Sequence, residues 1–172
     1  LNDNDAEVRN AAVSGIWESD DHNLIGPLIA MLQNDPSELV RTAAAIALGK
    51  FGSLAANGKL LPRDGKRIKR ALISVLQNPD HDTELRGRSL ESAAYFNTPE
   101  ITDMIQQAYK SSDPLLCSSA LYAMGRTGDS TWVPTIIREM DNRDPAMRYE
   151  AASASAEIMD EDAVPYLIPL IQ

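Results

Sequence analysis

Clustered basic side chains are the residues of this chain whose types and spacing could do chemistry. Six of its 16 Lys and Arg residues lie within twelve positions, between Lys59 and Arg70, and Asp64 is the one acid among them. Such a patch, on a chain of net charge −9, could hold a phosphate, a nucleic-acid strand or an acidic protein segment. The same segment also fits a solvated loop followed by the charged outer face of a helix. The candidate binding residues are Lys59, Arg63, Lys66 and Arg67.

A second set of arginines recurs along the chain. Arg9, Arg41, Arg86 and Arg148 stand at equivalent positions and Cys117 replaces arginine at one more, which gives spacings of 32, 45, 31 and 31 residues. This row could bind an anionic ligand. Because small residues recur with each position, we expect instead that each arginine joins adjacent repeats through an aspartate or a carbonyl group.

Residues for catalysis or metal binding do not form a recognisable set. His22 and His81 lie in expected turns and lack the spacing of a zinc or calcium site. Cys117 has no sequence partner that would mark a nucleophile, and no Gly-rich phosphate loop occurs. The sequence therefore predicts a protein without enzymatic activity, bound metal or cofactor.

The repeat length identifies the elements that must position these residues. A period near 31 residues is too long for a coiled coil and corresponds to two short helices with two turns. Four residues before each arginine position stands a residue of a type that caps helix N-termini well. The expected caps are Asp5, Ser37, Asp82, Asp113 and Asp144.

The first helix of each repeat is expected to carry small side chains at the third and sixth positions after the arginine position, such as Ala44 and Ala47. Larger apolar residues just before that position, from Val8 in the first repeat to Met147 in the last, should fill the core. A second amphipathic helix follows in each repeat. The expected second helices span 24–32, 68–76, 100–108, 132–140 and 163–171.

These elements predict an all-α, right-handed α-solenoid of about five helix pairs, forming one domain over residues 1–172. The second repeat exceeds the others by about 13 residues, and Gly52, Gly58, Pro62 and Gly65 predict an insertion at about 52–65, between its two helices. Such an insertion usually forms an exposed, functional loop. The expected repeats span about 5–35, 36–79, 80–112, 113–143 and 144–172.

Composition agrees with a helical protein, since aromatic residues at 5% argue against a β-sandwich. Without an apolar run of roughly 18 residues or an N-terminal signal, we expect a cytoplasmic protein that does not insert into membranes. The chain begins with Leu1 rather than Met and its last expected helix has no cap before Gln172. We therefore expect a piece of a longer chain, able to self-associate through uncapped terminal repeats.

The pattern resembles the HEAT-repeat superfamily, in particular the short bacterial HEAT-like repeats of the phycobilisome-lyase type. The resemblance rests on the run 144–148 with its Ala-rich continuation, and on Thr127-Gly128-Asp129 before the helix that contains 133–137. It implies an armadillo-like solenoid that acts as an interaction scaffold, with the second helices lining its concave face. The solvent-facing candidates on that face are Arg70, Ser74, Gln77, Thr102, Gln106, Tyr109, Arg138 and Asp141.

Three functions follow from these observations. The leading hypothesis is a scaffold that binds a protein or peptide along the concave face. The resemblance alone suggests the second, a chromophore-lyase-type or lyase-accessory protein. The third is nucleic-acid or phosphate binding through the basic segment. A pI near 4.6 opposes nucleic-acid binding, because phosphate contacts need an excess of Lys and Arg.

Overall fold

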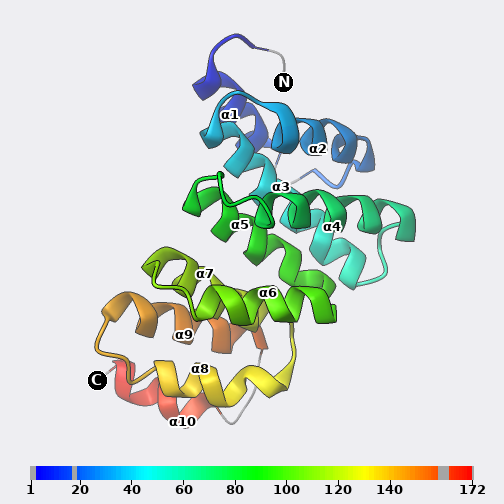
Figure 1. Cartoon of the computed structure of the whole chain (residues 1–172). Coiled ribbons are helices and arrows are strands. Elements are labelled where there is room, and N and C mark those ends of the chain that lie inside the picture. The colour runs from blue at the N-terminus through cyan, green and yellow to red at the C-terminus, as the bar shows by residue number, and fades with distance from the viewer. Residues whose placement is uncertain (1–2, 17–18, 159–162, 172) are drawn as a thin grey trace. The chain divides into compact units, whose positions relative to one another are not determined.

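The computed structural model describes residues 3–16, 19–158 and 163–171 of the chain. Within these ranges it contains helices and turns and no strand (Figure 1). The chain divides into two compact units, Leu1–Phe96 and Asn97–Gln172. The described ranges hold ten α-helices, which confirms the all-α repeat architecture; the right-handed sense of the solenoid stays a prediction.

The first unit is built around one long helix, α3, which contacts every other α-helix of the unit. Its core contains fully buried Leu28, Leu48, Ile68, Leu72 and Leu85. The α-helices of this unit are α1 (Ala6–Gly15), α2 (Ile25–Asn34), α3 (Glu38–Ala56), α4 (Pro62–Leu76) and α5 (Thr83–Ala93), with short 3-10 turns at His22–Leu24 and Ala94–Phe96.

The second unit has α7 at its centre, in contact with α6, α8 and α9. Ile101, Ile105, Leu121 and Met124 are fully buried in its core. The α-helices of this unit are α6 (Pro99–Tyr109), α7 (Pro114–Arg126), α8 (Val133–Glu139), α9 (Pro145–Ile158) and α10 (Val164–Leu167), with 3-10 turns at Ser130–Trp132 and Ile168–Ile171.

The predicted caps stand at the starts of the first helices. Asp5 accepts hydrogen bonds from the amides of Glu7 and Val8, and Asp113 does the same for the first turn of α7. Asp82 and Asp144 each accept one such bond, from Glu84 and Ala146. Ser37 holds the N-cap position of α3 without a side-chain hydrogen bond. Five helices therefore begin where local capping chemistry predicts.

The small residues of the first helices let neighbouring helices approach closely. Ala44 and Ala120 are fully buried. A Cβ atom placed on Gly125 of α7 would lie 2.6 Å from the Cα and the carbonyl oxygen of Ala154 in α9. One placed on Gly49 of α3 would lie 2.7 Å from the Ser92 hydroxyl in α5. Within each unit, small residues therefore form the close contact between first helices, α3 with α5 and α7 with α9.

The first repeat departs from the expected burial. Val40, Leu85, Leu116 and Met147 are buried as predicted, whereas Val8 is 50% exposed, so its assignment to the core was wrong. Among the described helices, α1 packs mainly against α3, and its outer side, including Val8, faces solvent.

The extra length of the second repeat lies mostly in helices, so its assignment to an exposed loop at about 52–65 was wrong. Helix α3 runs through Gly52 to Ala56, α4 begins at Pro62, and only residues 57–61 connect them. Gly52 packs against Ser92, Tyr95 and Phe96, and Gly65 packs against Ala55 and Phe96. These two glycines allow close helix packing, and only Gly58, with a φ of 69°, makes the turn.

Helix α3 is long and apolar enough to cross a membrane by length and composition. Arg41 and Lys50 interrupt its apolar residues, so the helix does not stand out in the sequence as an unbroken apolar run. Half of its apolar window is buried inside the first unit, which is also what the core helix of a helical repeat shows.

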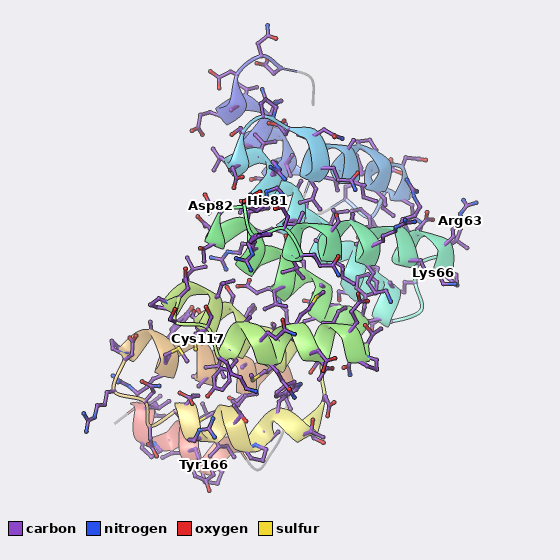
Figure 2. The ribbon with its side chains drawn as sticks, in the orientation of Figure 1. Arg63, Lys66, His81, Asp82, Cys117 and Tyr166 are labelled. Atoms are coloured by element: carbon purple, nitrogen blue, oxygen red, sulfur yellow. The ribbon has the colours of Figure 1, made fainter. Side chains whose placement is uncertain are left out.

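The segment formed by α10 and the 3-10 turn after it exposes apolar side chains. Ile168 is 48% and Ile171 is 86% exposed, and Tyr166 projects from the same segment (Figure 2). Self-association through this surface stays a prediction.

The contact between α7 and α9 predicts opposite effects for two Gly→Ala substitutions. Gly125→Ala should lower the free energy of unfolding by about 1–3 kcal/mol, because the backbone of Ala154 must move to admit the methyl group. Gly15→Ala is the control, because no atom lies within 4 Å of its Cβ position, and it should be neutral or stabilise by up to ~1 kcal/mol. Urea unfolding followed by circular dichroism measures both. Equal stability of the two variants would contradict the close helix contact.

Candidate functional site

Two groups of residues that were predicted separately lie on one face of α4. Arg63, Lys66 and Arg67 belong to the predicted basic patch, and Arg70, Ser74 and Gln77 belong to the predicted concave face. Successive members are one to four positions apart, and all lie within one side of the helix. All six are exposed, and Arg63 and Lys66 project outward at the start of α4 (Figure 2). This surface, the α4 face, consists of Arg63, Lys66, Arg67, Arg70, Ser74 and Gln77.

The opposite side of α4 explains why these residues point outward. Ile68, Leu72 and Val75 are almost fully buried and pack in the core of the first unit, where α4 contacts α2, α3 and α5. Burial of this apolar stripe fixes the rotation of the helix, so the residues between its positions must face solvent.

Asp64 lies at the base of the α4 face and is buried, with 8% of its surface exposed. Its carboxylate accepts a hydrogen bond from Arg67 Nη1 at 3.2 Å and lies 3.7 Å from Arg63 Nε. Both arginine side chains remain largely accessible, at 55% and 80% exposure. One carboxylate in the first turn of α4 therefore holds two of the four cations of the face and leaves them open to solvent.

Helix α2 borders the α4 face without adding charge. A Cβ atom placed on Gly26 would lie 3.8 Å from Arg67 Nη2, so the Arg67 side chain reaches over the α2 backbone. Helix α2 contains no charged residue, and its Ala30 and Gln33 are exposed. The positive charge of the α4 face is therefore not neutralised by α2.

Lys59 does not belong to the α4 face, because it lies in the connection before α4. The pKa of Asp20 is lowered, first by its hydrogen bond and ion pair with Lys50, 2.9 Å away, and to a smaller extent by the charge of Lys59. The structure thus separates this member of the predicted patch from the other three.

In the second unit, two predicted residues meet in a hydrogen-bonded network. Tyr109, at the end of α6, donates its hydroxyl proton to Glu139 of α8 and accepts a bond of 2.7 Å from Arg138 Nη2. Arg138 Nε also donates to Glu139 at 3.3 Å, and Asn142 donates to the other carboxylate oxygen at 2.6 Å. Thr102 and Gln106 lie further back on α6, and Asp141 is exposed just after α8. Asp141 is joined to Arg138 by a backbone hydrogen bond, from its amide to the Arg138 carbonyl.

Glu139 is the buried centre of this network, with 8% exposure. Desolvation alone would raise the pKa of Glu139, but the hydrogen bonds from Tyr109, Asn142 and Arg138 outweigh it, so the pKa is lowered and the carboxylate stays ionised. Burial and the bond to Glu139 raise the pKa of Tyr109. The network ties α6 to α8 and fixes the Tyr109 and Arg138 side chains.

Sequence reasoning missed Glu139 and Asn142, and it named Asp64 as the one acid of the basic segment without giving it a role. Glu139 lies three positions after buried Ile136, where the helical spacing calls for an apolar residue. An acid at a core position signals a buried partner. The partner, Tyr109, is 30 residues away in the chain. The spacing of residues around Glu139 could not identify it.

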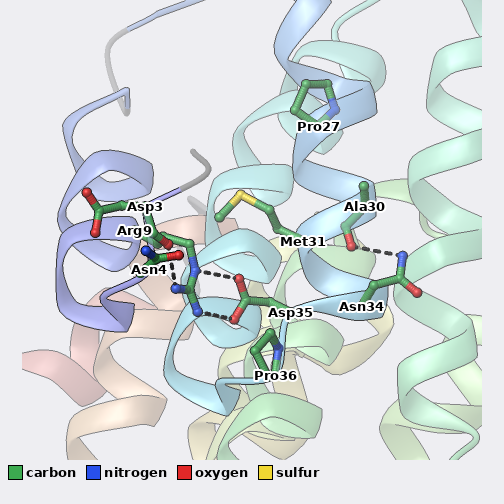
Figure 3. Close-up of a pocket in the computed structure, with 9 residues that line it drawn as sticks. All are labelled: Asp3, Asn4, Arg9, Pro27, Ala30, Met31, Asn34, Asp35 and Pro36. Atoms are coloured by element: carbon green, nitrogen blue, oxygen red, sulfur yellow. Dashed lines mark hydrogen bonds and ion pairs between the residues drawn. The ribbon is translucent and has the colours of Figure 1, made fainter.

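The arginine row makes contacts within the protein. Arg9 donates from Nε and Nη2 to the two Asp35 carboxylate oxygens, both at 2.8 Å, and from Nη1 to the Asp3 carbonyl (Figure 3). Arg41 donates to the Leu32 carbonyl at 3.0 Å, and its Nη2 lies 3.0 Å from His81 Nε2.

The remaining positions of the row differ from one another. Arg148 donates to the carbonyls of Asn142 and Arg143. Cys117 donates its thiol proton to the Tyr109 carbonyl at 3.3 Å. Arg86 Nε is buried without a hydrogen-bond partner among the described residues. Each of these contacts joins the helix that carries the residue to a neighbouring turn or helix end, for Arg9, Arg41, Cys117 and Arg148 alike.

Two hollows of the first unit lack the chemistry of a catalytic centre. A cleft of about 580 Å³ lies beside α1 and α2, with Arg9 and Asp35 in its wall (Figure 3). All three guanidinium nitrogens of Arg9 already donate inside the protein, so this cleft offers no free cation to a ligand. A second groove, of about 370 Å³, is lined mostly by small and apolar residues of α1 and α3. The described residues contain no group of three side chains able to hold a metal.

The Arg9–Asp35 pair predicts a specific pH dependence. The hydrogen bonds from Arg9 lower the pKa of Asp35 in the folded protein. The pair therefore stabilises the fold at pH values above the ordinary aspartate pKa of ~3.9. This stabilisation is lost as the pH falls through the lowered pKa of Asp35 in the folded state. Asp35→Asn should therefore cost most stability at neutral pH and progressively less below about pH 4. Urea unfolding across this range measures the difference, with exposed Asp103→Asn as a charge-matched control. A pH-independent difference would show that the pair does not contribute in this way.

The Tyr109 network predicts a second effect. Tyr109→Phe should destabilise the protein by about 1.5–3 kcal/mol, because buried Glu139 loses a donor while remaining charged, and it should raise the pKa of Glu139. Tyr122→Phe is the matched control, because the hydroxyl of Tyr122 bonds exposed Glu157, and it should cost less than ~1 kcal/mol. Thermal unfolding and NMR titration of the Glu139 side chain give the two readouts. Similar losses in both variants would mean that the network adds nothing beyond a surface bond.

Comparison with known proteins supports the repeat architecture and shows which part of the chain lies outside the matched repeats. A family model for HEAT repeats matches residues 1–63 and 118–172, more than half of the chain, and leaves 64–117 between them. That unmatched stretch contains most of α4, the helix with the exposed basic face. No curated protein matches the chain. The match confirms the resemblance seen in the repeated residues, and the chain belongs to the HEAT-repeat family.

Proposed function

We propose that this HEAT-repeat chain is a non-enzymatic scaffold that binds a protein or peptide on the exposed side of its second helices. Repeats of this family commonly mediate protein–protein interaction. In the first unit, the α4 face is the proposed contact surface. The observation that supports it is the convergence of Arg63, Lys66 and Arg67 with Arg70, Ser74 and Gln77 on one uncovered side of one helix.

The second unit offers a separate surface on α6 and α8. Gln106, Arg138 and Asp141 are exposed there, and Tyr109 and Thr102 are half-buried. Because Glu139 fixes the Tyr109 and Arg138 side chains, this surface is ordered before a partner arrives. Preorganised side chains lose less conformational entropy on binding, which favours their use in recognition.

The chemistry of the described residues supports a binding role over catalysis. Burial raises the pKa of Cys117, and the charge of Glu139 adds to this, so its thiol is a poor nucleophile. The acceptor groups of the Tyr109 network are already occupied by donors within the protein. The chromophore-lyase alternative rests on the resemblance alone.

The proposal is tested by site-specific photo-crosslinking in cells of the native host. A photoreactive amino acid at Ser74, on the α4 face, should give a discrete crosslinked protein, whereas one at exposed Ala11, on the first helix α1, should not. The crosslinked protein would then be purified and its affinity for the chain measured. Crosslinking from Ala11 alone would place the partner on the first helices and contradict the proposal.

A further inference from the structure

We infer that the segment recognised by the α4 face is an acidic stretch of polypeptide with several Asp or Glu side chains. This inference rests on the proposed function, that a protein or peptide binds there. Four cations, Arg63, Lys66, Arg67 and Arg70, lie on this face, and the single carboxylate among them belongs to buried Asp64.

The cations of the face are available to a ligand. Lys66 and Arg70 are exposed, and neither takes part in an ion pair among the described residues. Arg63 and Arg67 are held by Asp64 but keep 80% and 55% of their side chains exposed. On a chain of net charge −9, such a local excess of positive charge attracts anionic segments and repels basic ones.

The positions of the side chains indicate how a ligand would lie. Arg63 and Arg67, like Lys66 and Arg70, are one helical turn apart, a rise of about 6 Å. Alternate residues of an extended peptide are separated by roughly 7 Å and point to the same side. Acidic residues at alternate positions would therefore face successive cations along α4.

Arg67 has a particular place in this arrangement. Asp64 fixes its Nη1, and its Nη2 reaches over Gly26 of α2. Because α2 is uncharged and has no side chain at this point, a ligand carboxylate could approach Arg67 from the α2 side without meeting a charge on α2. Asp64 acts here as a positioning residue that aims the guanidinium group outward.

A polypeptide fits these observations better than a nucleic acid. The four cations span only about 10 Å of helix, room for few phosphates. The acidic charge of the chain opposes a polyanion that would extend beyond the face. An acidic peptide can place its carboxylates on the face and continue as a neutral chain over α2.

The experiment uses the full chain and three fluorescent probes: a short peptide of alternating glutamate and serine, the same peptide with glutamine for glutamate, and single-stranded oligothymidine of equal length. Fluorescence anisotropy should show binding of the glutamate peptide, weaker at higher salt because exposed charges are screened over about 8–10 Å. The glutamine peptide should not bind.

Two charge-matched variants locate the binding. Lys66→Ala with Arg70→Ala should weaken binding of the glutamate peptide by about tenfold, as expected for the loss of two exposed ion pairs. Lys110→Ala with Arg143→Ala removes the same charge from exposed positions outside the α4 face and should change affinity by less than about twofold. Circular dichroism checks that both variants keep the helical fold.

The outcomes separate this inference from the proposed function. Equal binding of the glutamate and glutamine peptides, or equal losses in the two variants, would overturn the acidic ligand. Tighter binding of oligothymidine that is lost with Lys66 and Arg70 would assign the face to nucleic acid. A partner that crosslinks at Ser74 but binds the Lys66→Ala, Arg70→Ala variant unchanged would also refute the acidic ligand while supporting the scaffold. Peptide binding without any crosslink at Ser74 would instead count against the scaffold.

Discussion

The close approach of successive first helices is the constraint on which the other features of each unit depend. Where α7 meets α9, the backbone of Ala154 occupies the space that a side chain on Gly125 would need, and Gly49 meets Ser92 in the same way between α3 and α5. Such contacts tolerate few residue types, so the repeated residues of the first helices are determined by the packing of these helices against one another. The outer side of the second helices carries no such requirement, and this is where the sequence is free to vary from repeat to repeat.

Helix α4 shows how one element meets both demands. Its buried stripe, including Ile68 and Leu72, fixes its rotation in the core, and its exposed side carries half of the Lys and Arg residues of the second repeat. Exposed charges of this kind contribute little to stability, since water solvates them well. Asp64 is the exception, because it is buried and ion-paired. Its burial couples the packing of the helix to the orientation of Arg67.

Local rules predicted much of the fold, and tertiary contacts explain most of what was missed. The caps Asp5 and Asp113 could be identified because a capping bond involves only neighbouring residues. The prediction of a loop at 52–65 was wrong because Gly52 and Gly65 allow close packing against Phe96, some 30 to 45 residues away in the chain. Placing the start of the second helix at 68 instead of Pro62 hid the fact that two candidate groups share one face. Glu139 was missed because its partner Tyr109 lies in another helix.

The short reach of the arginine contacts has a consequence for how the chain folds. Arg9 bonds Asp35, 26 positions further along the chain, and Arg41 contacts His81, 40 positions further along. Chains whose native contacts are local in sequence lose little loop entropy before those contacts form, and they fold fast. Nucleation can then begin at more than one helix pair and spread to its neighbours, as in other linear repeat proteins. A newly made helix pair would find its partners within the segment just synthesised, without waiting for the end of the chain.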